Sequence, residues 1–129
     1  MNKKVLIVED DKVNQIVLSK HLSNNFELDS DIAVDGLEAI DKFKESAGST
    51  SPYLIVFMDI IMPNMNGFDS TKAIRVYERE QGLKRTPIIL VSGNLIEDSL
   101  VQATSCGSDY LIPKPIALSQ LKEVVERFA

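Results

Sequence analysis

Val5-Leu6-Ile7-Val8-Glu9-Asp10-Asp11 is the stretch of this 129-residue sequence that decides the fold class. Its first four residues are all apolar and show no alternation, a pattern typical of a strand that is covered on both faces of a parallel sheet. Three acidic residues follow at once. In parallel sheets the chemistry collects at the carboxyl ends of the strands, so these carboxylates are candidates for a functional site.

Other apolar runs repeat this pattern along the chain. Residues 54–58 and 88–91 are clear strand candidates, and residues 28–34 and 110–112 are weaker ones. The stretches between them have helical composition and spacing: residues 14–23, 37–46, 68–81, 96–105 and 119–128. Five strands that alternate with five helices predict a doubly wound parallel sheet with helices on both faces. At this length, and without a second composition zone, residues 1–129 are expected to form a single domain.

Two of the expected helices have apolar stripes that we assign to the core. In the first helix the stripe consists of Asn14, Val17, Leu18, His21 and Leu22. In the last helix it consists of Leu118, Leu121, Val125 and Phe128. His21, the single histidine, is therefore interpreted as a half-buried helix residue rather than a catalytic one.

Composition excludes several classes of function. The 14 Lys and Arg residues against 19 Asp and Glu residues give a net charge of −5, which disfavours direct binding to nucleic acid. The single cysteine, Cys106, cannot form an internal disulfide or a thiolate metal cage. No apolar run approaches the roughly 20 residues of a membrane helix, and the run at 5–8 is too short for a signal peptide. We therefore expect a cytoplasmic location.

Reactive side chains follow four of the expected strands. Glu9 and Asp10 follow the first, Asp59 the third, Ser92 the fourth and Lys114 the fifth. Two carboxylates about 4 Å apart repel by about 4 kcal/mol at an effective dielectric constant near 20, so a shared pocket needs counter-charges. A lysine ammonium and Mg²⁺, which prefers oxygen ligands, would supply them. Beside them, a carboxylate is either a metal ligand only or also a nucleophile toward phosphorus.

Five segments, taken together, resemble the receiver domain of the two-component response-regulator family. They are residues 5–11 (VLIVEDD), 33–39 (AVDGLEA), 58–67 (MDIIMPNMNG), 88–92 (IILVS) and the pair Lys114-Pro115. Each segment alone is a weak signal, but all five occur in order at receiver-like distances, so the match covers essentially the whole chain. The resemblance implies a flavodoxin-like (βα)5 fold with strand order 2-1-3-4-5.

The resemblance also implies a role for each matching residue. Asp59 matches the phosphoacceptor, which takes a phosphoryl group from the phosphohistidine of a histidine kinase or histidine-phosphotransfer protein. The implied Mg²⁺ ligands are Glu9, Asp10, the Asp59 carboxylate and the Ile61 carbonyl, with Asp11 outside the set. Ser92 and Lys114 match the catalytic hydroxyl and lysine, and the Lys114-Pro115 bond is expected to be cis.

Phosphorylation of a receiver shifts a population between two conformations. By resemblance, Ser92 and the residue at position 111 form the switch, and Ile96, Leu100 and Leu111 lie on the surface that reports the change. Leu111 stands where the family usually has an aromatic residue, and strand alternation points the neighbouring Tyr110 to the other face. An aromatic rotamer switch is therefore not expected here.

The first helix carries a second apolar set, Val13 and Ile16, with Lys20 on the same side. Since only one helix face packs on the sheet, we expect this face to be exposed and to dock a histidine-phosphotransfer helix bundle. The sequence Val13-Asn14-Gln15 also resembles receivers of hybrid-kinase relays.

Two other functions stay open at this point. One is a Mg²⁺-dependent α/β phosphohydrolase, although such enzymes usually have a second acid two residues after the nucleophile, where this chain has Ile61. The other is a pseudo-receiver, an interaction module that is never phosphorylated. A receiver would phosphorylate and dephosphorylate itself, and would not be a turnover enzyme in the ordinary sense.

Overall fold

The computed structural model describes residues 3–93 and 97–129. Within these ranges, parallel strands form one sheet in the order β2-β1-β3-β4-β5, as predicted. The strands are β1 (Lys4–Val8), β2 (Asp29–Ala33), β3 (Val56–Asp59), β4 (Ile88–Ser92) and β5 (Tyr110–Pro113). The helices are α1 (Lys12–Phe26), α2 (Gly36–Ala47), α3 (Gly67–Gln81), α4 (Glu97–Cys106) and α5 (Leu118–Phe128). Among the described residues, no helix combines the length and apolar character needed to cross a bilayer.

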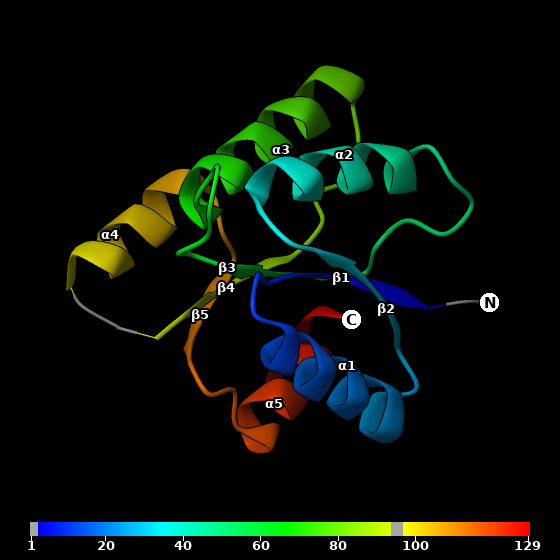
Figure 1. The fold of residues 1–129 in the computed structure, drawn as a ribbon. Coiled ribbons are helices and arrows are strands. Elements are labelled where there is room, and N and C mark those ends of the chain that lie inside the picture. Colours follow the sequence, from blue (N-terminus) through cyan, green and yellow to red (C-terminus); the bar gives the residue numbers. More distant parts are fainter. Residues whose placement is uncertain (1–2, 94–96) are drawn as a thin grey trace.

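The sheet separates two helical layers (Figure 1). Helices α1 and α5 cover one face, and α2, α3 and α4 cover the other. Successive residues of β1 alternate between two cores: Val5 and Ile7 pack with α1 and α5, whereas Leu6 and Val8 pack on the opposite side. The central strands are buried along their whole length, which confirms the prediction from their continuous apolar runs.

Most elements lie within two residues of their expected positions, and the differences have local causes. Helix α1 begins at Lys12 rather than at residue 14, because the Asp11 carboxylate caps it by accepting the Asn14 backbone N–H at 3.0 Å. Ile96, the expected first residue of the fourth helix, lies outside the described residues.

The predicted stripe of α1 is too wide. Leu18 and Leu22 are buried and His21 is half-buried, but Val17 is 49% exposed and Asn14 is also exposed. The helix packs on the sheet through a narrow contact at its middle. Its first turn is held at the carboxyl edge by polar contacts instead.

The predicted stripe of α5 holds except in the first turn of the helix. Leu121 and Val124 are the buried residues of this helix, whereas Leu118 is 46% exposed. Leu118 is the first residue of the helix. Val125 and Phe128 pack against the same core, as predicted, so the inward face differs from the expected stripe in including Val124 and leaving out Leu118.

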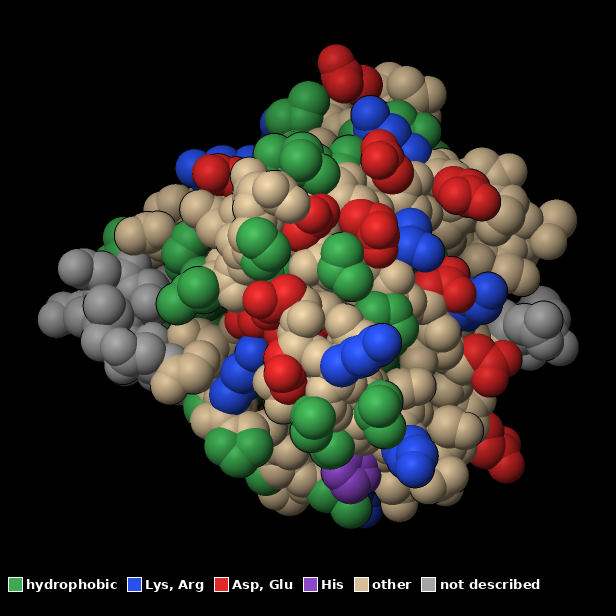
Figure 2. Space-filling view, in the orientation of Figure 1, with side chains coloured by type: hydrophobic (Ala, Val, Ile, Leu, Met, Phe, Trp, Pro, Cys, Tyr) green, Lys and Arg blue, Asp and Glu red, His purple; other side chains and the backbone are tan. Residues whose placement is uncertain are grey.

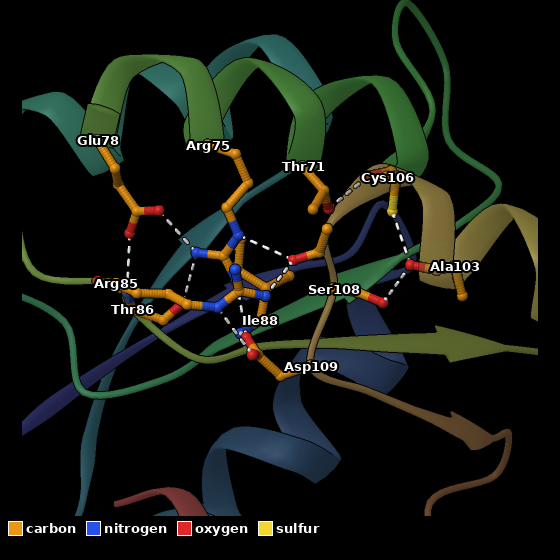
Figure 3. Close-up of polar contacts among 12 residues, drawn as sticks. Thr71, Arg75, Glu78, Arg85, Thr86, Ile88, Ala103, Cys106, Ser108 and Asp109 are labelled. Carbon is orange, nitrogen blue, oxygen red and sulfur yellow. Dashed lines mark hydrogen bonds and ion pairs between the residues drawn. The ribbon is translucent and has the colours of Figure 1, made fainter. Parts of the chain in front are cut away.

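A buried polar network joins α3 to the beginnings of β4 and β5 (Figure 3). The Arg75 guanidinium contacts Glu78 Oε1 and Asp109 Oδ2, each at 2.7 Å, and donates to the carbonyls of Thr86 and Gly107, each at 2.8 Å. Arg75 and Glu78 are almost completely buried. This network, which was not predicted from the sequence, fixes the α4–β5 turn against α3.

Candidate functional site

The sheet topology brings together the four strand ends that carry reactive side chains. Strand β1 pairs with β3, β3 with β4, and β4 with β5, all in parallel. Glu9 follows β1, Asp59 and Ser92 are the last residues of β3 and β4, and Lys114 follows β5. These side chains therefore lie at the same carboxyl edge of the sheet.

Lys114 lies at the centre of this cluster. Its Nζ donates to Asp59 Oδ2 at 2.8 Å and to the two carboxylate oxygens of Glu9 at 2.9 and 3.2 Å. Its backbone N–H donates to the Ser92 carbonyl at 2.8 Å, and the Lys114-Pro115 bond is cis. Glu9 and Asp59 are buried, so the ammonium supplies the positive charge that the two carboxylates need.

The pKa values of the two buried carboxylates are shifted in opposite directions. Burial raises the pKa of Asp59 to about 7, and the neighbouring Glu9 carboxylate adds to this rise while Lys114 opposes it. Burial also favours a raised pKa for Glu9, but its hydrogen bonds with Asp59, Lys114 and Asn14 together bring it below the usual value. Burial disfavours the charged Lys114, yet both carboxylates raise its pKa above the ordinary value. In the metal-free protein, the negative charge of Asp59 is thus less well compensated than that of Glu9.

A third carboxylate completes a set that suits a hard divalent cation. Glu9, Asp10 and Asp59 each offer an oxygen, and these oxygens lie within 4.8 Å of one another. Asp10 is exposed whereas the other two are buried, so a bound ion would reach both protein oxygens and water. Mg²⁺ is bound in this way, through few carboxylates and several waters. The donor set therefore fits Mg²⁺.

Asp11 and Ile61, which the sequence analysis also considered, are not members of this group of three carboxylates. Asp11 caps α1, as described above, and is not in the group. Ile61 lies two residues beyond Asp59, in the β3–α3 loop, with its side chain 76% exposed. Its implied contribution is through its backbone carbonyl.

The loop after Asp59 is shaped by backbone constraints. A Cβ at Gly67 would lie 2.3 Å from the Asp59 carbonyl oxygen, so only glycine permits this close approach. The Gly67 N–H donates to the Ile60 carbonyl at 2.8 Å. Asn64, in the left-handed region with φ of 67°, donates to Asp35 Oδ2 at 2.7 Å and ties this loop to the start of α2.

Glu9 is held by α1 as well as by Lys114. Asn14 Nδ2 donates to Glu9 Oε1 at 2.7 Å, and Gln15 Nε2 donates to the Glu9 carbonyl at 2.7 Å. Sequence reasoning assigned Asn14 to the core and missed both contacts. The signal that could have found them is the Asp11 cap, which places residues 14 and 15 on the first turn of α1, beside the end of β1.

A cavity of about 340 Å³ lies beside the site, between α1 and the segment that leads from β5 into α5. Its walls include Asn14, Leu18, His21, Ile116 and Leu121, and Glu9, Asp59 and Lys114 border it. The first turn of α1 is therefore not closely packed on its inner side. Its side-chain hydrogen bonds to Glu9 connect it to the site.

The expected docking and switch residues occupy different surfaces. Val13 and Ile16 are 66% and 52% exposed, and Lys20 is exposed on the same helix. Figure 2 shows exposed hydrophobic side chains among acidic and basic ones on this side of the molecule.

The expected switch residues lie on β4 and β5. Ser92 is buried at the end of β4. Leu111 packs toward α3 and α4, and Tyr110 packs on the opposite face near α5, as strand alternation predicted.

Comparison with known proteins identifies the family. The family model for the response regulator receiver domain matches residues 5–126. The chain belongs to this family and is a receiver domain of two-component and phosphorelay signalling, as the sequence motifs predicted.

The similar curated proteins are histidine kinases. The chain is 34% identical over 126 residues to hybrid signal transduction histidine kinase L of Dictyostelium discoideum, covering 97% of this chain and 7% of that protein. It is 34% identical over 125 residues to the osmosensing histidine protein kinase SLN1 of Saccharomyces cerevisiae, covering 97% and 10%. The chain thus spans a small part of the length of these relatives.

Solved structures share the fold. The chemotaxis protein CheY4 of Vibrio cholerae superposes with a TM-score of 0.85 at 23% identity, covering all of both chains. The receiver domain of the histidine kinase CKI1 of Arabidopsis thaliana, solved with Mg²⁺ and BeF₃⁻, gives a TM-score of 0.86 at 29% identity, covering 98% of this chain and 89% of that one.

Proposed function

We propose that Asp59 is the phosphoacceptor and that residues 1–129 form one receiver domain. The donor is the phosphohistidine of a histidine kinase or of a histidine-phosphotransfer protein. The observation that carries this proposal is the contact of Lys114 Nζ with Asp59 Oδ2 at 2.8 Å, which places a positive charge beside a buried carboxylate at a strand end.

The reaction replaces a phosphorus–nitrogen bond by a phosphorus–oxygen bond. An Asp59 carboxylate oxygen attacks the phosphorus, the bond from phosphorus to the imidazole nitrogen breaks, and the histidine leaves with the electron pair of that bond. Lys114 can turn from Glu9 toward the phosphoryl oxygens and neutralise the charge on them. The Ser92 hydroxyl donates to another of these oxygens.

Glu9, Asp10, the Asp59 carboxylate and the Ile61 carbonyl are the proposed Mg²⁺ ligands. When bound, Mg²⁺ supplies positive charge for the oxygens of the transferred group. The three carboxylates face one lysine ammonium within the site, so the metal-free site carries excess negative charge. This excess charge supports metal binding, and the pKa of Asp59, which burial raises to about 7 with a further contribution from Glu9, is consistent with it.

The partner surface that we propose consists of Val13, Ile16 and Lys20, defined here as the α1 patch. Two exposed apolar side chains next to the site suit the apolar face of a helical partner. The Lys20 ammonium suits acidic residues of the partner beside that face. The net charge of −5 supports a protein partner over nucleic acid. We further propose a cytoplasmic location, which the buried and unpaired Cys106 supports.

Phosphorylation is proposed to shift the domain between two conformations, with Ser92 and Leu111 as the switch residues. Ser92 is the last residue of β4. Leu111 lies on β5, which pairs with β4 in parallel. The partly buried Leu111 side chain packs against the core under α3 and α4. A change at Ser92 can therefore reach the surface that includes Leu100.

Transfer from a phosphohistidine protein tests this proposal. The parent should acquire one acid-stable, base-labile phosphoryl group in the presence of Mg²⁺, and Asp59→Asn should acquire none. Asp41→Asn, on the exposed side of α2, is the matched control. Equal labelling of Asp59→Asn and the parent would overturn the assignment.

A further inference from the structure

We propose that Asn14 is a positioning residue for the metal site, which it serves by holding the Glu9 carboxylate in place. The inference rests on the proposed function of this site and concerns a residue outside the proposed ligand set. Asn14 Nδ2 donates to Glu9 Oε1 at 2.7 Å, one of the shortest side-chain hydrogen bonds at the site.

Two side-chain donors hold the Glu9 carboxylate. A glutamate has one more rotatable bond than an aspartate, so its carboxylate needs more support to stay in one place. Glu9 Oε1 accepts from Asn14 and from Lys114, at 2.7 and 2.9 Å. When Lys114 turns toward a phosphoryl group, Asn14 is the donor that remains on this oxygen. Its amide thus keeps the Glu9 carboxylate oriented for metal binding.

The donor at position 14 carries no charge. A lysine or arginine at position 14 would orient Glu9 equally well, but its charge would repel a divalent cation. An aspartate would lack the N–H that the contact requires. The neutral amide of Asn14 can hold a carboxylate without adding to or reducing the charge that the metal meets.

Polar contacts attach the first turn of α1 to the site. Asp11 caps the helix at the Asn14 backbone N–H, and Gln15 Nε2 donates to the Glu9 carbonyl. Because a cavity lies beside the first turn of α1, these polar contacts are what link that turn to the site. Asn14 is exposed, and alanine is a better helix former, so removing its side chain tests positioning with little effect on folding.

Mg²⁺ titration of the metal-free protein, followed by amide NMR shifts, measures the expected effect directly. Asn14→Ala should bind Mg²⁺ about tenfold more weakly than the parent, at the lower end of the 10- to 100-fold losses found when a residue that orients a metal ligand is removed. Asn25→Ala is the matched control, because Asn25 donates to the His21 carbonyl on the same helix, away from the site. An affinity of Asn14→Ala equal to that of Asn25→Ala would overturn the proposal.

Labelling by acetyl phosphate separates positioning from a merely structural role. The Mg²⁺ concentration for half-maximal labelling of Asn14→Ala should rise by the same factor, while the rate at saturating Mg²⁺ matches the parent. A lower maximal rate at an unchanged midpoint would contradict the positioning role. If the parent itself is not labelled, the proposed function fails, and the NMR titration still decides the role of Asn14.

Discussion

Lys114 Nζ lies 2.8 Å from Asp59 Oδ2 and 2.9 Å from Glu9 Oε1, so that one ammonium bridges two buried carboxylates from different strand ends. The same contact has two consequences. It stabilises the metal-free protein, because it compensates charges that burial would otherwise disfavour. It also places the lysine where a phosphoryl group on Asp59 would need a counter-charge.

Lys114→Met should destabilise the metal-free protein by about 2 kcal/mol, because it removes charged hydrogen bonds and leaves two buried carboxylates together. Urea unfolding in the presence of a chelator measures this loss. Lys122→Met is the control, since Lys122 forms an exposed pair with Glu126 at 4.0 Å. Equal stabilities of the two variants would show that the bridge contributes nothing.

Asp10→Asn should stabilise the metal-free protein and reduce the rise in melting temperature that Mg²⁺ causes. The exposed Asp10 adds a third carboxylate to a pair that shares one lysine, and Mg²⁺ binding stabilises the folded state by linkage. Thermal melts with and without Mg²⁺ check both effects, with Asp41→Asn as the control. A variant that melts lower, with its response to Mg²⁺ unchanged, would argue strongly against the site.

Asp35→Asn should lose stability at neutral pH, and the loss should shrink in acid. The Glu38 backbone N–H and the Asn64 side chain donate to Asp35 and hold the pKa of its carboxyl below the ordinary value. The charged form therefore stabilises the protein above the unfolded pKa of about 3.9, and this contribution disappears as the pH falls through the lower folded value. Because Asp35 is partly exposed, the expected loss at pH 7 is about 0.5 kcal/mol.

Urea unfolding of the parent and Asp35→Asn at several pH values from 7 to about 3.5 tests this sign. Asp41→Asn, on the same helix, corrects for general charge effects. A difference in stability that grows as the pH falls would contradict the assigned direction.

Arg75→Met should be the most damaging single change away from the site. It leaves Glu78 and Asp109 without their shared guanidinium, and breaking a buried pair in this way costs about 3 kcal/mol. Arg75→Lys should rescue little, since an ammonium cannot reproduce the forked contacts to carboxylates and carbonyls. Arg79→Met, on an exposed part of α3, should be nearly neutral, and urea unfolding compares all three.

Val13→Glu combined with Ile16→Glu should slow phosphoryl transfer from a protein donor and leave labelling by acetyl phosphate intact. The substitution replaces the apolar part of the α1 patch by charge without altering Glu9, Asp59 or Lys114. Parallel time courses with the two donors separate docking from chemistry. Equal loss with both donors would reject the α1 patch as a docking surface.

How far the sequence predicts this molecule depends on the kind of interaction. Continuous apolar runs located the central strands. The parallel topology then brought together Glu9, Asp59 and Lys114, of which the first and the last are 105 residues apart in the sequence. The Arg75–Asp109 pair was not predictable in this way, because its residues look like ordinary surface charges in the sequence. Their burial depends on how α3 meets the α4–β5 turn.

The helix faces show a second limit of sequence reasoning. Helical spacing alone placed Val17 and Leu118 in the core, but both are about half-exposed. Spacing gives the period of an apolar stripe, whereas the rotation of a helix on the sheet is set by its attachments at the ends. For α1 these attachments are the contacts of Asp11, Asn14 and Gln15, which periodicity does not report.

The phosphoacceptor role of Asp59 is the central claim, and intact-mass measurement after treatment with acetyl phosphate and Mg²⁺ tests it most directly. The parent should gain the mass of one phosphoryl group, lose the gain when Mg²⁺ is chelated beforehand, and differ from Asp59→Asn, which should gain nothing. An equal gain in Asp59→Asn, or no gain in the folded and Mg²⁺-bound parent, would contradict the account.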